Sequence, residues 1–126
     1  MPCIFTIDEK DKIIHFKIDE PFEINMILDK DKEAYYYSVK YGIKRFLVDL
    51  TESRNTADIY DLRSFAQKQT DRFADLRFKM RLALLVLPDD NSFDPLETVM
   101  YNAGHQVKQF TDHKEAIGYL KDLKVD

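Results

Sequence analysis

The chain has 126 residues, of which 44% are hydrophobic and 33% are charged, and its formal net charge is −4. This size and balance are typical of one soluble globular domain, residues 1–126, that folds without a disulfide or a metal. The 19 basic and 23 acidic residues are mixed along the chain, which excludes the clustered lysines and arginines of a nucleic-acid-binding face. Cys3 is the only cysteine, and the longest apolar run, LALLVLP, is too short to span a bilayer, so we expect a cytoplasmic protein with no membrane insertion.

The first half of the chain predicts a hairpin, a helix and a buried strand. Residues 3–7 and 13–18 alternate apolar and polar side chains on either side of a charged tip, which is typical of a β-hairpin. A helix is expected over residues 29–42, where Gly42 would end it in the left-handed conformation. Its apolar face is weak and consists of Ala34, Tyr37 or Val39, and Tyr41. The almost continuous apolar run at 44–50 indicates a strand covered on both faces.

An amphipathic helix is predicted from Ala57 to about Leu76, because apolar residues recur there at intervals of three and four. This apolar stripe consists of Ile59, Leu62, Phe65, Ala66, Phe73 and Leu76. Asn55 is a suitable N-cap for the helix, and Asp58 would then occupy its third position.

The second half predicts two more strands, each followed or preceded by a helix. Residues 80–87 form the second continuous apolar strand, which we expect at the centre of the sheet. A helix over 94–104 is indicated by Asp94 as N-cap, Pro95 in the first turn and Gly104 at the far end. A short strand is predicted at 106–110. The last helix, 112–123, would be capped by Asp112 and would turn Ala116, Ile117, Leu120 and Leu123 inward.

The predicted order is therefore ββαβαβαβα. Strand and helix alternate after the hairpin, which requires a mixed, mostly parallel five-stranded sheet with right-handed crossovers and helices packed on it. This α/β fold class is the main structural prediction from the sequence.

The element order and three segments resemble the STAS superfamily, in particular its SpoIIAA-like group of small bacterial proteins. The segments are RFLVDLTES, MRLALLVLP and NAGHQVKQFTDHKEAIGYL. The resemblance covers essentially the whole chain and implies a single STAS-like domain. It also implies a regulatory or protein-interaction role, because STAS domains act as anti-sigma antagonists, in signalling complexes or as appendages of transporters.

The resemblance makes Thr56 a candidate phospho-acceptor. Signalling members carry an Asp-Ser-Ser/Thr-Gly motif at the start of the second helix, where a partner kinase phosphorylates Ser or Thr. Here Asn55-Thr56 stands in place of Asp-Ser, and the glycine of the motif is missing. A phosphate at a helix N-terminus would meet free N–H groups, and Arg54 is adjacent, but Asp58 would repel it. The alternative hypothesis is that this segment only caps the helix.

Several other polar residues can be considered as phosphorylation or metal-binding sites, and the sequence gives little support for any of them. Asp49 ends an apolar strand like the phospho-accepting Asp of a receiver domain, but the remaining receiver residues are absent, so it should instead bond loop amides. The loop 88–94 lacks the glycine and closing Glu of a calcium loop. His105 and His113 are separated by a strand and His15 should lie on the surface, so no histidine pair has metal-ligand spacing. We expect no metal and no cofactor.

Four tyrosines lie within the segment 34–41, and they cannot all face one stripe of a helix. One or two of them should be exposed, with Tyr35 and Tyr36 as candidates for an interaction surface. The alternative hypotheses are that the rings line the seam between helix and sheet, or that they border a small apolar pocket under the helix.

No nucleophile elbow and no glycine-rich phosphate loop is present, which argues against an enzyme. The leading hypothesis is a non-enzymatic regulatory or protein-interaction module, whose partner is another protein or a second copy in a homodimer. Its expected surface consists of Arg54, Asn55 and Asp58, together with Tyr35 and Tyr36. The alternative is binding of a small apolar, lipid-like ligand in a pocket under the first helix.

Overall fold

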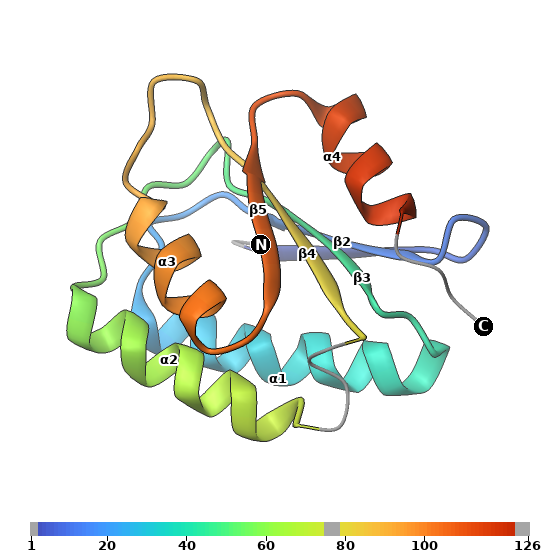
Figure 1. The fold of residues 1–126 in the computed structure, drawn as a ribbon, viewed down its shortest axis with the longest axis horizontal. Coiled ribbons are helices and arrows are strands. Elements are labelled where there is room, and N and C mark those ends of the chain that lie inside the picture. Colours follow the sequence, from blue (N-terminus) through green and yellow to red (C-terminus); the bar gives the residue numbers. More distant parts are fainter. Residues whose placement is uncertain (1–2, 75–78, 123–126) are drawn as a thin grey trace.

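The computed structural model describes residues 3–74 and 79–122 (Figure 1). Five strands and four helices follow one another in the order ββαβαβαβα. Their bounds are β1 Cys3–Asp8, β2 Ile13–Ile18, α1 Ile24–Tyr41, β3 Arg45–Asp49, α2 Ile59–Arg72, β4 Arg81–Leu85, α3 Asp94–Asn102, β5 Gln106–Phe110 and α4 His113–Lys121. The predicted positions Leu76 and Leu123 lie outside the described residues.

The five strands form one mixed sheet in the order β1-β2-β3-β4-β5. β1 pairs antiparallel with β2, and all other neighbours are parallel. The predicted α/β class, hairpin and parallel sheet are therefore confirmed. The expected place of the 80–87 strand is wrong, because β3 is the central strand and β4 lies beside it.

The start of α1 differs from the prediction, whereas its end agrees. Gly42 ends the helix with φ = 65°, as expected. The helix begins at Ile24 rather than at residue 29, because the carboxylate of Glu23 accepts hydrogen bonds from the N–H groups of Asn25 and Met26. The buried stripe of α1 includes Asp31 and Ser38, and these two polar residues obscure the apolar periodicity in the sequence.

The start of α2, in contrast, was predicted too early. Asp58, and not Asn55, is the N-cap, and its carboxylate accepts from the N–H of Asp61 at 2.8 Å. Asn55 instead closes a local turn, in which its Oδ1 accepts from the N–H of Ala57 at 3.0 Å. Thr56 consequently precedes the helix and does not belong to its first turn.

The predicted N-cap residue is wrong for α3 and confirmed for α4. Phe93 occupies the N-cap position of α3 without a side-chain hydrogen bond, so the expected cap Asp94 is already the first helical residue. Asp112 caps α4 as predicted, accepting from the N–H of Lys114. The C-terminal end of α4 receives two arginines from the sheet, since Arg45 and Arg81 donate to the carbonyls of Lys121 and Tyr119.

Helices cover the two faces of the sheet unequally. Residues from α1, α2 and α3 form the larger apolar core on one face, whereas α4 packs on the other face (Figure 1). The second, smaller core consists of Ile13, Leu47, Ala83, Leu85, Ala116 and Leu120. Among the described residues, no helix has the length and apolar character needed to cross a membrane.

Candidate functional site

The segment 54–58 lies at the edge of the sheet where the parallel strands have their carboxyl ends. In open α/β sheets, ligands and partners are commonly bound at this edge, because the loops that follow the strands gather there. The loop after β3 meets the loop after β2 and the loop after β4 in this region. These contacts fix the shape of the segment.

Phe22 connects the segment to the loop after β2 as in a short parallel ladder. The N–H of Phe22 donates to the carbonyl of Arg54 at 2.9 Å, and the N–H of Thr56 donates to the carbonyl of Phe22 at 3.0 Å. The Thr56 hydroxyl donates to the same carbonyl at 2.9 Å. Phe22 itself is buried and its ring meets that of Phe93 edge to face. The backbone of the segment is thereby anchored in the core.

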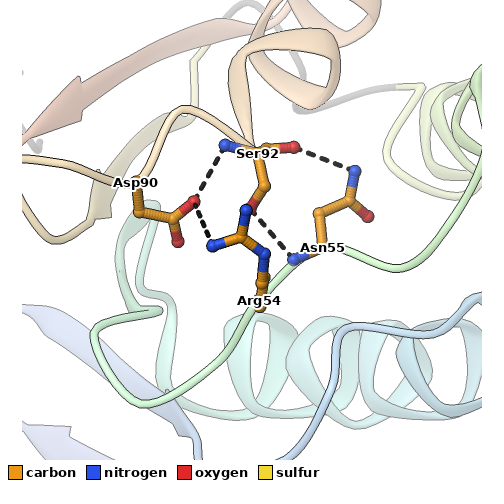
Figure 2. A network of polar contacts seen from close by, with 4 residues as sticks. All are labelled: Arg54, Asn55, Asp90 and Ser92. Atoms are coloured by element: carbon orange, nitrogen blue, oxygen red, sulfur yellow. Dashed lines mark hydrogen bonds and ion pairs between the residues drawn. The ribbon is translucent and has the colours of Figure 1, made fainter.

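Ser92 connects the segment to the loop after β4, as Figure 2 shows. Its hydroxyl accepts from the N–H of Asn55 at 3.1 Å, and its carbonyl accepts from the Asn55 side-chain amide at 3.0 Å. Asp90 accepts from the N–H of Ser92 at 2.8 Å and lies 4.0 Å from the Arg54 guanidinium. The two loops are therefore held together by side chains that are 37 residues apart in the chain.

Electrostatics favours the ionised form of Asp90. Burial raises the pKa of its carboxyl, but the side-chain and backbone hydrogen bonds with Ser92 and the charge of Arg54 outweigh this effect and hold the pKa below its ordinary value. The contact between the loops consequently retains its charge at neutral pH.

The outer side of this edge is exposed and partly apolar. Arg54, Thr56 and Asp58 are exposed, while Asn55 is half-buried against Ser92. Ile59 and Tyr60 at the start of α2 are also exposed, and Tyr60 shows 74% of its surface, the largest value among the exposed large hydrophobic residues. Exposed tyrosines combine a large apolar area with a polar tip and are enriched at protein interfaces.

Tyr35 and Tyr36 do not join this surface. Both are exposed, as expected for one or two of the four tyrosines, and Tyr36 shows 57% of its surface. They lie in the second half of α1, whose first residue is Ile24, so a rise of about 1.5 Å per residue places them roughly 17 Å along the helix from the end near Phe22. The predicted surface residues therefore occupy two separate regions.

Sequence reasoning missed a contact between two histidines. His15 on β2 and His113 at the start of α4 have ring centroids 6.4 Å apart, so two histidines that are distant in the sequence lie close together in the fold. They line a groove of about 210 Å³ on the half of the sheet beside α4. Among residues 3–74 and 79–122, no group of three or more His, Cys, Asp or Glu side chains is arranged to hold a metal ion.

Two further predicted polar residues have structural partners. Asp49 accepts from the N–H and the hydroxyl of Thr51, at 3.0 and 2.6 Å, as expected for a residue that bonds loop amides. His105 is buried, and its Nε2 lies 3.2 Å from the hydroxyl of Thr70.

A small cavity of about 50 Å³ lies in the core between the sheet and the helices α1 and α2. Its walls are almost entirely apolar and include Phe16, Phe46, Phe73, Met80, Leu84 and Met100. Asp31 of α1 and Gln69 of α2 are its polar lining residues. No sequence signal marked this pair, because the two residues are 38 positions apart.

The sequence was also compared with known proteins. It matches no protein-family model, and it matches no curated protein.

Proposed function

We propose that the chain is a non-enzymatic, STAS-like regulatory module of the bacterial cytoplasm that works by binding another protein. Its binding surface would be the segment 54–58 with the exposed start of α2. The observation that carries this proposal is the anchoring of the segment by Phe22 and Ser92, which leaves Arg54, Asp58 and Tyr60 exposed on a fixed backbone. A preorganised surface loses little conformational entropy when a partner binds.

Photo-cross-linking from Tyr60 tests this surface. Benzoylphenylalanine in place of Tyr60 should capture a partner in cells, whereas the same group in place of Tyr101 should not. Tyr101 is the matched control, because it is 71% exposed and lies on α3. An adduct of twice the chain mass would identify a homodimer. Equal capture at both positions, or capture at neither, would contradict the proposal.

Once a partner is captured, single substitutions measure the contribution of the surface. Tyr60→Lys should weaken binding by about thirtyfold, the effect of losing one interface hot spot of about 2 kcal/mol. Tyr101→Lys should leave the dissociation constant unchanged. Tyr36→Lys separates the two predicted regions, because a strong effect there would move the surface to α1.

Phosphorylation of Thr56 is the regulatory part of the proposal. Thr56 is exposed and lies two residues after Arg54, which supports access by a kinase and a favourable charge nearby. A phosphate on Oγ1 would remove the proton that the carbonyl of Phe22 accepts and would place negative charge beside that oxygen. The modification would therefore weaken the attachment of the segment to the loop after β2, which would then depend on the two backbone hydrogen bonds with Phe22. Intact-mass and peptide analysis after incubation with lysate and ATP should place one phosphate on Thr56 and none on Thr56→Ala.

The cavity under α1 supports a second candidate function, the binding of a small apolar ligand. Its almost wholly apolar walls match the surfaces that enclose such ligands. Native mass spectrometry of freshly purified protein should then show a bound species besides the bare chain.

A further inference from the structure

The polar residues of the cavity form a short chain of hydrogen bonds between α1 and α2. The carboxylate of Asp31 accepts from Nε2 of Gln69 at 2.9 Å and lies 3.3 Å from the Arg72 guanidinium. Asp31 is 4% exposed and Gln69 is 6% exposed, so both side chains are removed from solvent. This chain of contacts links the two helices above the apolar walls of the cavity.

The amide oxygen of Gln69, Oε1, differs from the amide nitrogen in having no hydrogen-bond partner in the part of the chain that the structure describes. An ionised carboxylate can only accept hydrogen bonds, which turns the NH₂ group of Gln69 towards Asp31 and leaves Oε1 on the other side of the amide. This oxygen is buried and has no hydrogen-bond partner among the described residues. A buried acceptor without a donor is costly, and such an atom beside a cavity marks a place where a donor is wanted.

We infer that the cavity binds a small, uncharged, mainly apolar molecule, or the end of one, that donates a single hydrogen bond to Gln69 Oε1. This inference rests on the second candidate function and names its ligand class. Alcohols and compounds with one N–H group belong to this class.

The same residues discriminate against other ligands. A carboxylate such as an ionised fatty acid brings no donor to Oε1, and its negative charge would lie close to Asp31 in a region of low dielectric constant. A pure hydrocarbon would leave Oε1 without a partner. The site therefore selects a neutral donor over both an anion and an alkane.

The size of the cavity limits the part of the ligand that it encloses. An engineered cavity of about 150 Å³ binds benzene, and the cavity here has about one third of that volume. By that proportion it encloses the hydroxyl end of a small alcohol, and the rest of the molecule requires the surrounding side chains to shift. A longer ligand requires α1 and α2 to move apart, and the polar link between Asp31, Gln69 and Arg72 would then have to open.

A titration with three probes of equal size tests the inference on the unmodified protein. The probes are 2-propanol, which donates a hydrogen bond, acetone, which only accepts, and acetate, which is anionic. Methyl NMR of labelled methionines provides the readout, because Met80 and Met100 line the cavity and Met26 does not. We expect 2-propanol to shift Met80 and Met100 saturably in the millimolar range while Met26 stays unchanged. Acetone should bind about tenfold more weakly, and acetate should not bind.

The outcomes separate the two proposals. Equal saturation by 2-propanol and acetone would overturn the role of Gln69 and leave ligand binding in the cavity intact. No saturable shift with any probe would mean that the cavity does not bind small molecules of this size, and both the inference and the second candidate function would fail.

Two variants provide controls. Gln69→Met replaces the amide by an apolar side chain of similar length, so the preference for 2-propanol over acetone should disappear. Ala34→Leu extends a lining residue of α1 into the cavity and should abolish binding of every probe. If Gln69→Met does not fold, the probe series on the unmodified protein still decides the question.

Discussion

The two faces of the sheet are packed against helices by different kinds of side chain. The face under α1, α2 and α3 is filled by large rings, among them Phe16, Phe46 and Phe73, and it retains a cavity with two buried polar residues. The face under α4 uses alanine at the contact, where Ala83 and Ala116 are both fully buried. Alanine lets a helix approach closely, whereas rings of fixed shape leave gaps between them. The face under α4 should therefore tolerate added volume less well than the face under α1, α2 and α3.

Enlarging an alanine on each face gives the largest contrast. Ala83→Leu should destabilise the protein by about 3 kcal/mol, because Ala83 is fully buried in the core under α4 and the added methyl groups would overpack it. Ala34→Leu should cost less than about 1 kcal/mol, because the cavity admits the added methyl groups. Chemical denaturation of both variants measures the difference. Equal costs would show that the cavity does not distinguish the two faces.

The pH dependence of stability tests the environment of Asp31, which pairs with Gln69 at the cavity under α1 and α2. Burial raises the pKa of Asp31 to about 6, with the Gln69 hydrogen bond and the charge of Arg72 opposing it. Its ordinary value is 3.8, so between these values the folded chain holds a proton that the unfolded chain has released. The contribution of Asp31 to the free energy of unfolding thus falls as the pH rises through this window.

Asp31→Asn should remove this dependence. From about pH 5 to about pH 7, the wild-type protein should lose about 1–2 kcal/mol relative to the variant. Denaturation curves of both proteins at these two pH values measure the change. A constant difference between them would place the pKa of Asp31 near its ordinary value.

The hydroxyl of Thr56 helps to attach the segment 54–58 to Phe22, which is buried in the core under α1, α2 and α3. Thr56→Val keeps the shape of the side chain but removes the hydrogen bond to Phe22, and it should cost about 1 kcal/mol. Thr56→Ser retains the hydroxyl and should cost less. Amide exchange at Thr56, whose N–H also donates to Phe22, should accelerate in the valine variant alone.

The smallest effect is expected on the face of α4, where the half of the sheet formed by β1 and β2 remains open. Burial lowers the pKa of His15, and the charge of His113 lowers it further, while Asp8 and Asp11 raise it. A lowered pKa means that the contribution of His15 to stability is present above its ordinary value of 6.5 and is lost as the pH falls below it.

His113→Gln should therefore raise the pKa of His15, as followed by NMR titration of the imidazole protons. The change in the free energy of unfolding should remain a fraction of about 1 kcal/mol, because the ring of His15 is half-exposed and solvent screens it. An unchanged titration curve would show that the charge of His113 does not influence the pKa of His15.

The features that the sequence could predict are those that depend on residues close together in the chain. Gly42, Asp112 and the alternating hairpin were recognised because each acts through neighbours within a few residues. The start of α1 was missed because Glu23 is an uncommon cap and because Asp31 interrupts the apolar stripe.

The contacts that build the candidate site depend on long-range pairing. Ser92 reaches Asn55 and Asp31 reaches Gln69 only after the strands have aligned the loops and helices. Nothing in the local pattern of these residues signals a partner, and the same holds for the approach of His15 to His113. Periodicity reveals which side of an element is buried, but it does not reveal what lies opposite.

The strand order has a consequence for how the molecule forms. Each strand lies beside the strand that precedes it in the chain, from β1 to β5. The sheet can therefore grow in the direction of synthesis, with each new strand adding to an edge that is already present as the chain leaves the ribosome. No strand has to be inserted between two strands that are already paired.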